Sequence, residues 1–124
     1  MAELGRRSWV IPGGHIPIDS TGDEPRWTSH DRLSVLNASD EPAELEMTVY
    51  FADREPAGPF ELQVAARRVR EVRFNDLVEP TAIELGVPYA AVIRASRPVV
   101  VQFTRQDTGQ PSNAQATTIA YGED

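Results

Sequence analysis

The feature that most constrains the fold is a strict alternation of apolar and polar residues between Glu44 and Phe51. In this segment, ELEMTVYF, Leu45, Met47, Val49 and Phe51 share one parity, and Glu44, Glu46, Thr48 and Tyr50 share the other. Successive side chains of a β-strand point to opposite faces, so the pattern predicts a strand with one buried and one solvated face. Strands of this kind are typical of antiparallel sheets.

The alternation recurs in segments that are bounded by Pro, Gly, Asn or Asp. Phe60–Val64 repeats it after a turn rich in Pro and Gly, which predicts a β-hairpin with the first segment. The other predicted strands are Ser8–Ile11, Arg32–Leu36, Val69–Phe74, Ala90–Ala95, Val99–Thr104 and Thr117–Tyr121. Asp76–Gly86 has weak helical character, which nearby prolines limit to about one turn. We therefore predict an all-β fold, an antiparallel, jelly-roll-like β-sandwich of about eight strands.

The size and composition suit one domain without disulfides. The chain has 124 residues, and we expect a single domain over residues 1–124 with a frayed tail at 122–124. It contains no cysteine, which excludes thiolate catalysis and thiolate zinc sites. It also lacks an apolar stretch of about 18 residues, the length that spans a bilayer, so we expect a soluble cytoplasmic protein.

Residues 66–77, ARRVREVRFNDL, concentrate four arginines in a chain of formal net charge -7. The alternation slips here, which predicts a strand corner or bulge around Arg67–Glu71 and places Val69 on the inner face. DNA binding requires a net basic face, and the acidic neighbours of these arginines make nucleic acid an unfavoured partner. We expect Arg67, Arg68 and Arg73 to pair with acidic residues, within or between subunits.

The sequence predicts neither a metal site nor a catalytic centre. His15 and His30 lack the spacing of a zinc-ligand pair, so we expect structural histidines and no metal or other cofactor. Ser29, His30 and Asp31 are adjacent, and neighbouring side chains on a strand point apart, which argues against a catalytic triad. No nucleophile elbow, P-loop or dinucleotide fingerprint is present. We expect a protein without enzymatic activity.

Polar residues near the ends of predicted strands are candidates for a ligand site. Tryptophan beside Asn, Asp and Arg can stack on a sugar ring and hydrogen-bond its hydroxyls. The candidate ligand-binding residues are Trp9, Glu24, His30, Asn75, Asp76, Arg105, Asp107 and Asn113. A structural role is an equal alternative, in which tryptophan fills the core, Asn75 and Asp76 form a turn, and Arg105 pairs with Asp107.

Several longer motifs occur in a fixed order between Trp9 and Tyr121. They are GHIP at 14–17, GDEP at 22–25, SHD at 29–31, YFADREP at 50–56, VRFNDL at 72–77 and TIAY at 118–121. In order and spacing the chain closely resembles the sensory rhodopsin transducer family. It departs from the family pattern at Gly13–His15 and at Pro111–Ser112, in loops that bear on ligand and partner choice rather than on the fold.

The resemblance implies a jelly-roll β-sandwich, similar to carbohydrate-binding modules, that assembles as a homotetramer. It also implies a cytoplasmic signalling role, which in the best-known member involves a membrane rhodopsin receptor, and it implies no enzyme. Three functions follow as expectations. The first is a transducer-like module that binds a small molecule, for example a carbohydrate-like one. The second is an adaptor bound to a sensory rhodopsin, and the third is a DNA-binding regulator.

Overall fold

The computed structural model describes residues 4–21, 28–109 and 114–124, and its regular structure is almost entirely β. The strands are β1 (Arg6–His15), β2 (His30–Asn37), β3 (Ala43–Phe51), β4 (Ala57–Val64), β5 (Arg68–Arg73), β6 (Pro88–Asp107), β7 (Ala114–Ile119) and β8 (Tyr121–Glu123). Every pairing between them is antiparallel. The predicted all-β antiparallel sandwich of about eight strands is confirmed, as is the hairpin formed by β3 and β4.

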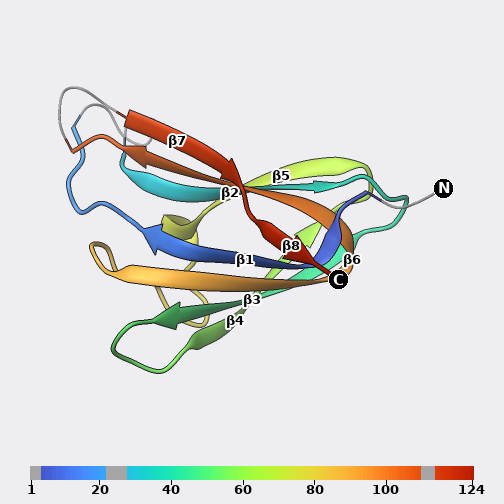
Figure 1. Cartoon of the computed structure of the whole chain (residues 1–124), viewed down its shortest axis with the longest axis horizontal. Coiled ribbons are helices and arrows are strands. Elements are labelled where there is room, and N and C mark those ends of the chain that lie inside the picture. The colour runs from blue at the N-terminus through green and yellow to red at the C-terminus, as the bar shows by residue number, and fades with distance from the viewer. Residues whose placement is uncertain (1–3, 22–27, 110–113) are drawn as a thin grey trace.

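Two layers share the long strand β6 (Figure 1). In the first layer, sheet A, the order is β4-β3-β6-β1-β8, and in the second, sheet B, it is β5-β2-β6-β7. Residues 89–95 of β6 pair with β3 in sheet A, and residues 100–106 pair with β2 in sheet B. The segments Ala90–Ala95 and Val99–Thr104, predicted as separate strands, are therefore two halves of one strand. Pro98 lies between the two pairing regions, where a missing backbone N–H interrupts neither of these ladders.

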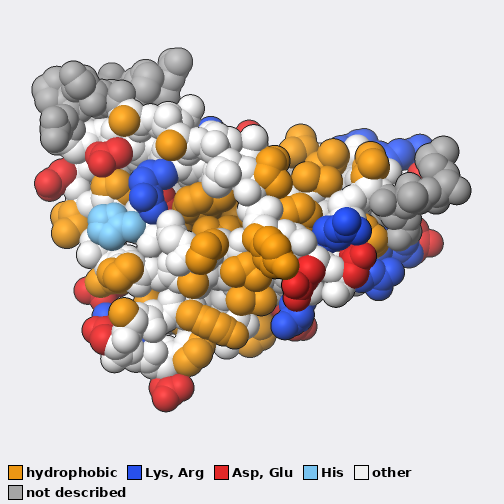
Figure 2. Space-filling view, in the orientation of Figure 1, with side chains coloured by type: hydrophobic (Ala, Val, Ile, Leu, Met, Phe, Trp, Pro, Cys, Tyr) orange, Lys and Arg blue, Asp and Glu red, His pale blue; other side chains and the backbone are white. Residues whose placement is uncertain are grey.

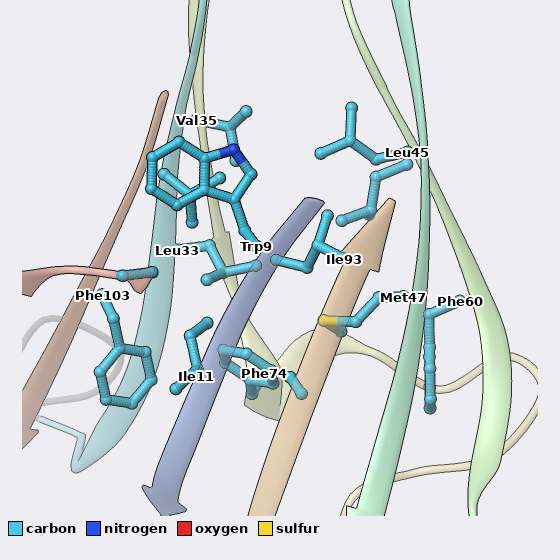
Figure 3. Close-up of a cluster of buried hydrophobic side chains, with 14 of the residues drawn as sticks. Trp9, Ile11, Leu33, Val35, Leu45, Met47, Phe60, Phe74, Ile93 and Phe103 are labelled. Carbon is cyan, nitrogen blue, oxygen red and sulfur yellow. The ribbon is translucent and has the colours of Figure 1, made fainter. Parts of the chain in front are cut away.

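The core lies between the two layers, where the inward-facing side chains of both sheets meet (Figure 3). Met47 and Ile93 of sheet A and Leu33 of sheet B are completely buried. Phe74 is also fully buried, and its ring centroid lies 5.1 Å from that of Tyr89 and 6.1 Å from that of Phe103. The alternation seen in the sequence thus gives each sheet its apolar inner face.

The predicted corner near the arginine run is present. Arg67 has a φ of 53°, in the left-handed region, where the chain leaves β4 of sheet A and enters β5 of sheet B. The predicted inward orientation of Val69 is wrong, since 64% of this residue is exposed. Val69 pairs with Leu36 on the outer face of sheet B, because the corner reverses the parity of the strand that follows it.

Two further segments differ from the predictions. Asp76–Gly86 contains no α-helix, and the helical structure there is a single 3-10 turn, η1 (Phe74–Asp76), followed by a loop. The tail at 122–124 was expected to fray. Instead, Gly122 pairs with Trp9 in the β1–β8 ladder, and the Asp124 carboxylate lies 3.1 Å from the Arg6 guanidinium. Across residues 4–21, 28–109 and 114–124, no helix has the length and apolar character needed to cross a membrane.

Candidate functional site

A groove of about 700 Å³ opens along the side of the sandwich, between β1 of sheet A and β7 of sheet B. It forms because β8 pairs with β1 only as far as Val10, and beyond that residue the two layers diverge. Phe103 and Ile11 contribute apolar surface, and Arg105 and Asp107 lie on the same inward parity of β6. In the space-filling view, hydrophobic side chains gather along this surface, with basic and acidic side chains near its loop end (Figure 2).

One buried carboxylate braces this open side of the molecule. Asp31 of β2 has no exposed surface, and its Oδ1 accepts a hydrogen bond of 3.1 Å from Nε of Arg105. Its Oδ2 accepts one from the backbone N–H of His15 at 2.9 Å and one from the hydroxyl of Tyr89 at 2.7 Å. Nη2 of Arg105 donates to the carbonyl of Gly13 at 3.2 Å. The side chains of Asp31 and Arg105 thus hydrogen-bond to the backbone of β1 in the part of that strand with which β8 does not pair.

The surroundings of Tyr89 fit this bracing role. Burial raises the pKa of the Tyr89 hydroxyl well above its ordinary value, and the charge of Asp31 and the hydrogen bond to it act in the same direction. The phenol therefore stays protonated and donates to the carboxylate at any physiological pH. A Cβ on Gly14 would lie 2.2 Å from the Tyr89 ring, so only glycine lets the ring lie against β1.

The polar end of the groove continues into a second hollow of about 320 Å³. Asp107 lines both the groove and this hollow, and His15 and Asp19 line the hollow alone. The Asp107 carboxylate is exposed, and its Oδ1 accepts a hydrogen bond of 2.9 Å from the N–H of Gly109. Arg105 and Asp107, both predicted as ligand-binding residues, are therefore brought together at one end of one groove. The alternative in which they pair with each other is not observed, because Arg105 is bonded to Asp31.

Trp9 lies in the core rather than in a ligand site. Only 5% of the residue is exposed, and its indole N–H lies 3.0 Å from the carbonyls of both Arg6 and Val99. Gly122 of β8 packs against the ring, since a Cβ there would lie 2.9 Å from it. Trp9 therefore fills the core, which was the structural alternative to a ligand-binding role.

The other predicted ligand residues lie elsewhere. The imidazole of His30 is buried, with Nδ1 2.8 Å from the carbonyl of Thr28 and Nε2 3.0 Å from Nη1 of Arg32. Asn75 in η1 donates to the carbonyl of Ser29 at 3.1 Å. Asp76 is exposed and lines a separate hollow beside β5. Glu24 and Asn113 lie outside the described residues.

The arginines predicted to form ion pairs have different surroundings. Arg67 lies 4.0 Å from the carboxylate of Asp40 at a highly exposed position. Arg68 donates to the carbonyl of Arg67, and among the described residues it has no acidic partner. Arg73 lies opposite Arg32 in the ladder between β2 and β5. Nε of Arg32 lies 3.5 Å from the carboxylate of Glu71.

The adjacent Ser29, His30 and Asp31 do not form a catalytic triad. Ser29 is buried, and its hydroxyl lies 2.6 Å from the carbonyl of Asp19 and 3.1 Å from the hydroxyl of Thr108. The part of the chain that the structure describes contains no cluster of His, Asp or Glu able to hold a metal ion.

Sequence reasoning did not identify the brace around Asp31. Its partners Tyr89 and Arg105 are 58 and 74 residues away, so no local motif joins them. One signal was available. Asp31 has the parity of Leu33 and Val35, which face the core, and a charged residue at a core-facing position requires a buried partner.

Comparisons with known proteins agree with this architecture. A crystal structure titled Thermotoga maritima 1070 matches with a TM-score of 0.87 and 31% identity, covering 97% of each chain. The structure of the Anabaena sensory rhodopsin transducer matches with a TM-score of 0.75 and 45% identity, covering 83% of this chain and 99% of that one. No curated protein matches the sequence.

The family comparison covers the full sandwich. The family model described as Anabaena sensory rhodopsin transducer matches residues 4–122, a range that includes every element from β1 to the middle of β8. The resemblance predicted from the motifs is thereby confirmed. The chain belongs to the Anabaena sensory rhodopsin transducer family.

Proposed function

We propose that this protein is a non-enzymatic, cytoplasmic sensory transducer that binds a small molecule in the groove between β1 and β7 and works as a homo-oligomer. The observation that carries the proposal is the immobilised Arg105 beside Asp107 at one end of a groove whose remaining lining is mostly apolar. Small-molecule sites commonly combine an apolar lining with a few fixed polar groups, within a volume of about 300–1,000 Å³. The groove fits that description.

The distribution of polar groups favours binding over catalysis. Ser29, His30 and Asp31 are buried, and each is bonded to partners that stabilise the fold. In the groove, Arg105 is a fixed donor and Asp107 an exposed acceptor, a combination suited to recognition. The burial of Trp9 removes the stacking surface on which a sugar site would depend, and leaves Tyr121 as the exposed aromatic ring at the groove.

A ligand screen with a groove-filling variant tests this proposal. Compounds that bind the native state raise the unfolding temperature, so a panel of sugars, amino acids and nucleotides should contain stabilising members. The substitution Ala116→Phe places a large ring in the groove and should abolish that stabilisation. Glu61→Phe, at an exposed position on β4, is the matched control and should retain it. A panel without stabilising members, or equal responses from both variants, would contradict the proposal.

Exposed apolar side chains on the outer face of sheet B support the homo-oligomer. Val69 is 64% exposed, Leu36, its partner in register, is 39% exposed, and Ile119 on β7 is 57% exposed. The edge strands β5 and β7 also carry mostly exposed side chains. Apolar surface and free strand edges are commonly covered by association with another chain. Sedimentation should give a multiple of 13.7 kDa, with a tetramer as the expected assembly, and a stable monomer would contradict this part of the proposal.

A second candidate is an adaptor for a sensory rhodopsin. It is supported by the 45% identity to the Anabaena sensory rhodopsin transducer over 83% of this chain. A sensory rhodopsin whose gene lies near the gene for this protein should then retain this protein when the rhodopsin is immobilised on an affinity column. Light should change the amount retained. If no rhodopsin from the same genome binds it, the adaptor role is excluded while the ligand-binding role stands.

A further inference from the structure

We infer that the groove between β1 and β7 binds a zwitterion of the amino-acid class that carries a large apolar side chain. This inference rests on the proposed ligand-binding function and specifies the chemistry of that ligand. In the complex, Arg105 binds the α-carboxylate, Asp107 binds the α-ammonium group, and the apolar side chain lies along the groove.

Arg105 is held in place, and one edge of its guanidinium group remains available to donate hydrogen bonds to a ligand. Its Nε and Nη2 are bonded to Asp31 and to the carbonyl of Gly13, which fix the plane of the group. Among the described residues, its Nη1 has no hydrogen-bond partner, and the side chain is 35% exposed at the groove. A preorganised arginine donor is suited to a carboxylate, because little side-chain entropy is lost when the ligand binds.

Asp107 supplies the complementary charge at a suitable distance. It is two residues beyond Arg105 on the same face of β6, which separates the two Cβ atoms by about 6.6 Å along the strand. The N–H of Gly109 binds its Oδ1, and this leaves Oδ2 as an exposed acceptor. The carboxylate and ammonium groups of an amino acid are attached to one carbon atom, so a single ligand can contact both side chains.

The pair of charges also discriminates against simpler ligands. An apolar anion would be attracted by Arg105 but repelled by Asp107 and by the buried charge of Asp31. An apolar cation would leave the free donor of Arg105 without an acceptor. A zwitterion satisfies both exposed groups and adds no net charge to the groove.

The rest of the groove accommodates an apolar side chain. Ala114 and Ala116 on β7 leave space next to the polar end, and Ile11, Phe103 and Ala120 extend the apolar lining. The volume of about 700 Å³ exceeds what a small amino acid would fill. Large side chains such as those of phenylalanine and leucine remove more apolar surface from water and should bind most tightly.

Calorimetric titration with phenylalanine and two blocked derivatives tests the inference. Phenylalaninamide lacks the carboxylate, and N-acetylphenylalanine lacks the ammonium group. Each should bind roughly ten to a hundred times more weakly than phenylalanine, as expected for the loss of one charge-assisted hydrogen bond. Alanine, which keeps both charges but lacks the apolar body, should also bind more weakly than phenylalanine.

The variant Asp107→Asn separates recognition from stability. Asparagine keeps an oxygen that can accept from Gly109 but loses the charge, so the variant should fold normally and weaken phenylalanine binding by roughly tenfold or more. It should no longer distinguish phenylalanine from the N-acetyl derivative. Glu61→Gln is the matched control, because it removes an exposed carboxylate on β4 that does not line the groove. This variant should bind like the wild type.

Equal binding of phenylalanine and its blocked derivatives, or an Asp107→Asn variant that keeps the discrimination, overturns the inference. Binding of a sugar or nucleotide in the groove without any binding of amino acids also overturns it, but leaves the proposed function intact. If the whole panel fails to bind wild-type protein at millimolar concentration, both are overturned.

Discussion

Nε of Arg105 lies 3.1 Å from Oδ1 of Asp31, and the carboxylate of this pair is completely buried while the arginine reaches the surface of the groove. The pair joins β6 and β2, and through the carbonyl of Gly13 it reaches β1 in the other sheet. It therefore stabilises the open side of the sandwich and positions a donor at the candidate ligand site. Arg105 should for this reason affect both stability and binding.

The substitution Arg105→Gln should lower the free energy of unfolding by about 2–4 kcal/mol, because it leaves the charge of Asp31 buried without its cationic partner. Urea unfolding monitored by circular dichroism measures the change. Arg67→Gln is the control, since the exposed Arg67–Asp40 pair at 4.0 Å should contribute less than about 1 kcal/mol. Equal losses in the two variants would show that the Asp31–Arg105 pair is not a brace.

The Tyr89→Phe variant should lose about 1–3 kcal/mol of stability, because Asp31 loses one of its donors while the aromatic packing on Phe74 is kept. Unfolding midpoints in urea report this loss. The double variant Tyr89→Phe with Asp31→Asn should be less destabilised than the sum of the two single variants, as expected for residues in contact. Strict additivity would contradict the coupling.

Gly14→Ala should be destabilising although it adds only one methyl group. The added Cβ would lie 2.2 Å from the ring of Tyr89, so the ring must move away from β1 and its hydroxyl away from Asp31. A loss of about 2–3 kcal/mol is expected for overpacking at such a contact. Gly13→Ala is the control, because a Cβ at that position has no atom within 4 Å. Similar stability of both variants would argue against the close packing of Tyr89 on β1.

His30 should make stability depend on pH. Burial lowers the pKa of His30, and the charges of Arg73 and Arg32 act in the same direction, against the hydrogen bond to the Thr28 carbonyl. As the pH falls below the unfolded value of about 6.5, the unfolded chain takes up a proton that the folded chain does not, so stability decreases. Above that pH the contribution is constant.

Urea unfolding at about pH 7.5 and about pH 5.5 measures this effect, since the two values bracket the ordinary pKa of histidine. The wild type should be less stable at the lower pH, and His30→Gln should lose much of that difference. If the variant retains the full pH dependence, His30 is not its source.

The sequence predicted the strands well where alternation was regular, and less well where the chain changes sheets. Pro98 suggested a boundary between two strands, yet β6 continues through it because that residue lies between two ladders. Val69 was assigned to the wrong face because the corner at Arg67 changes the parity. Both errors arise where the chain changes its pairing partner, because the local sequence pattern does not reveal which strand is the partner.

The candidate site was predictable only in part. Arg105 and Asp107 closely follow the predicted strand Val99–Thr104, so both were expected at the same strand end, and the structure places both at one end of the groove. Trp9, His30 and Asp76 were grouped with them because polar or aromatic residues near strand ends were assumed to meet at one end of the sandwich. The pairing of β8 with β1 buries Trp9, and η1 directly follows β5, which is the opposite edge of sheet B from β7.

The groove between β1 and β7 is the surface on which we expect a ligand to be recognised. Nuclear magnetic resonance spectra of ¹⁵N-labelled protein, titrated with the most stabilising compound of the screen, test this claim directly. We expect chemical-shift changes concentrated at residues 10–13 of β1, 103–107 of β6 and 114–119 of β7. Changes confined to β5 and the hollow around Asp76, with the groove unaffected, would contradict it.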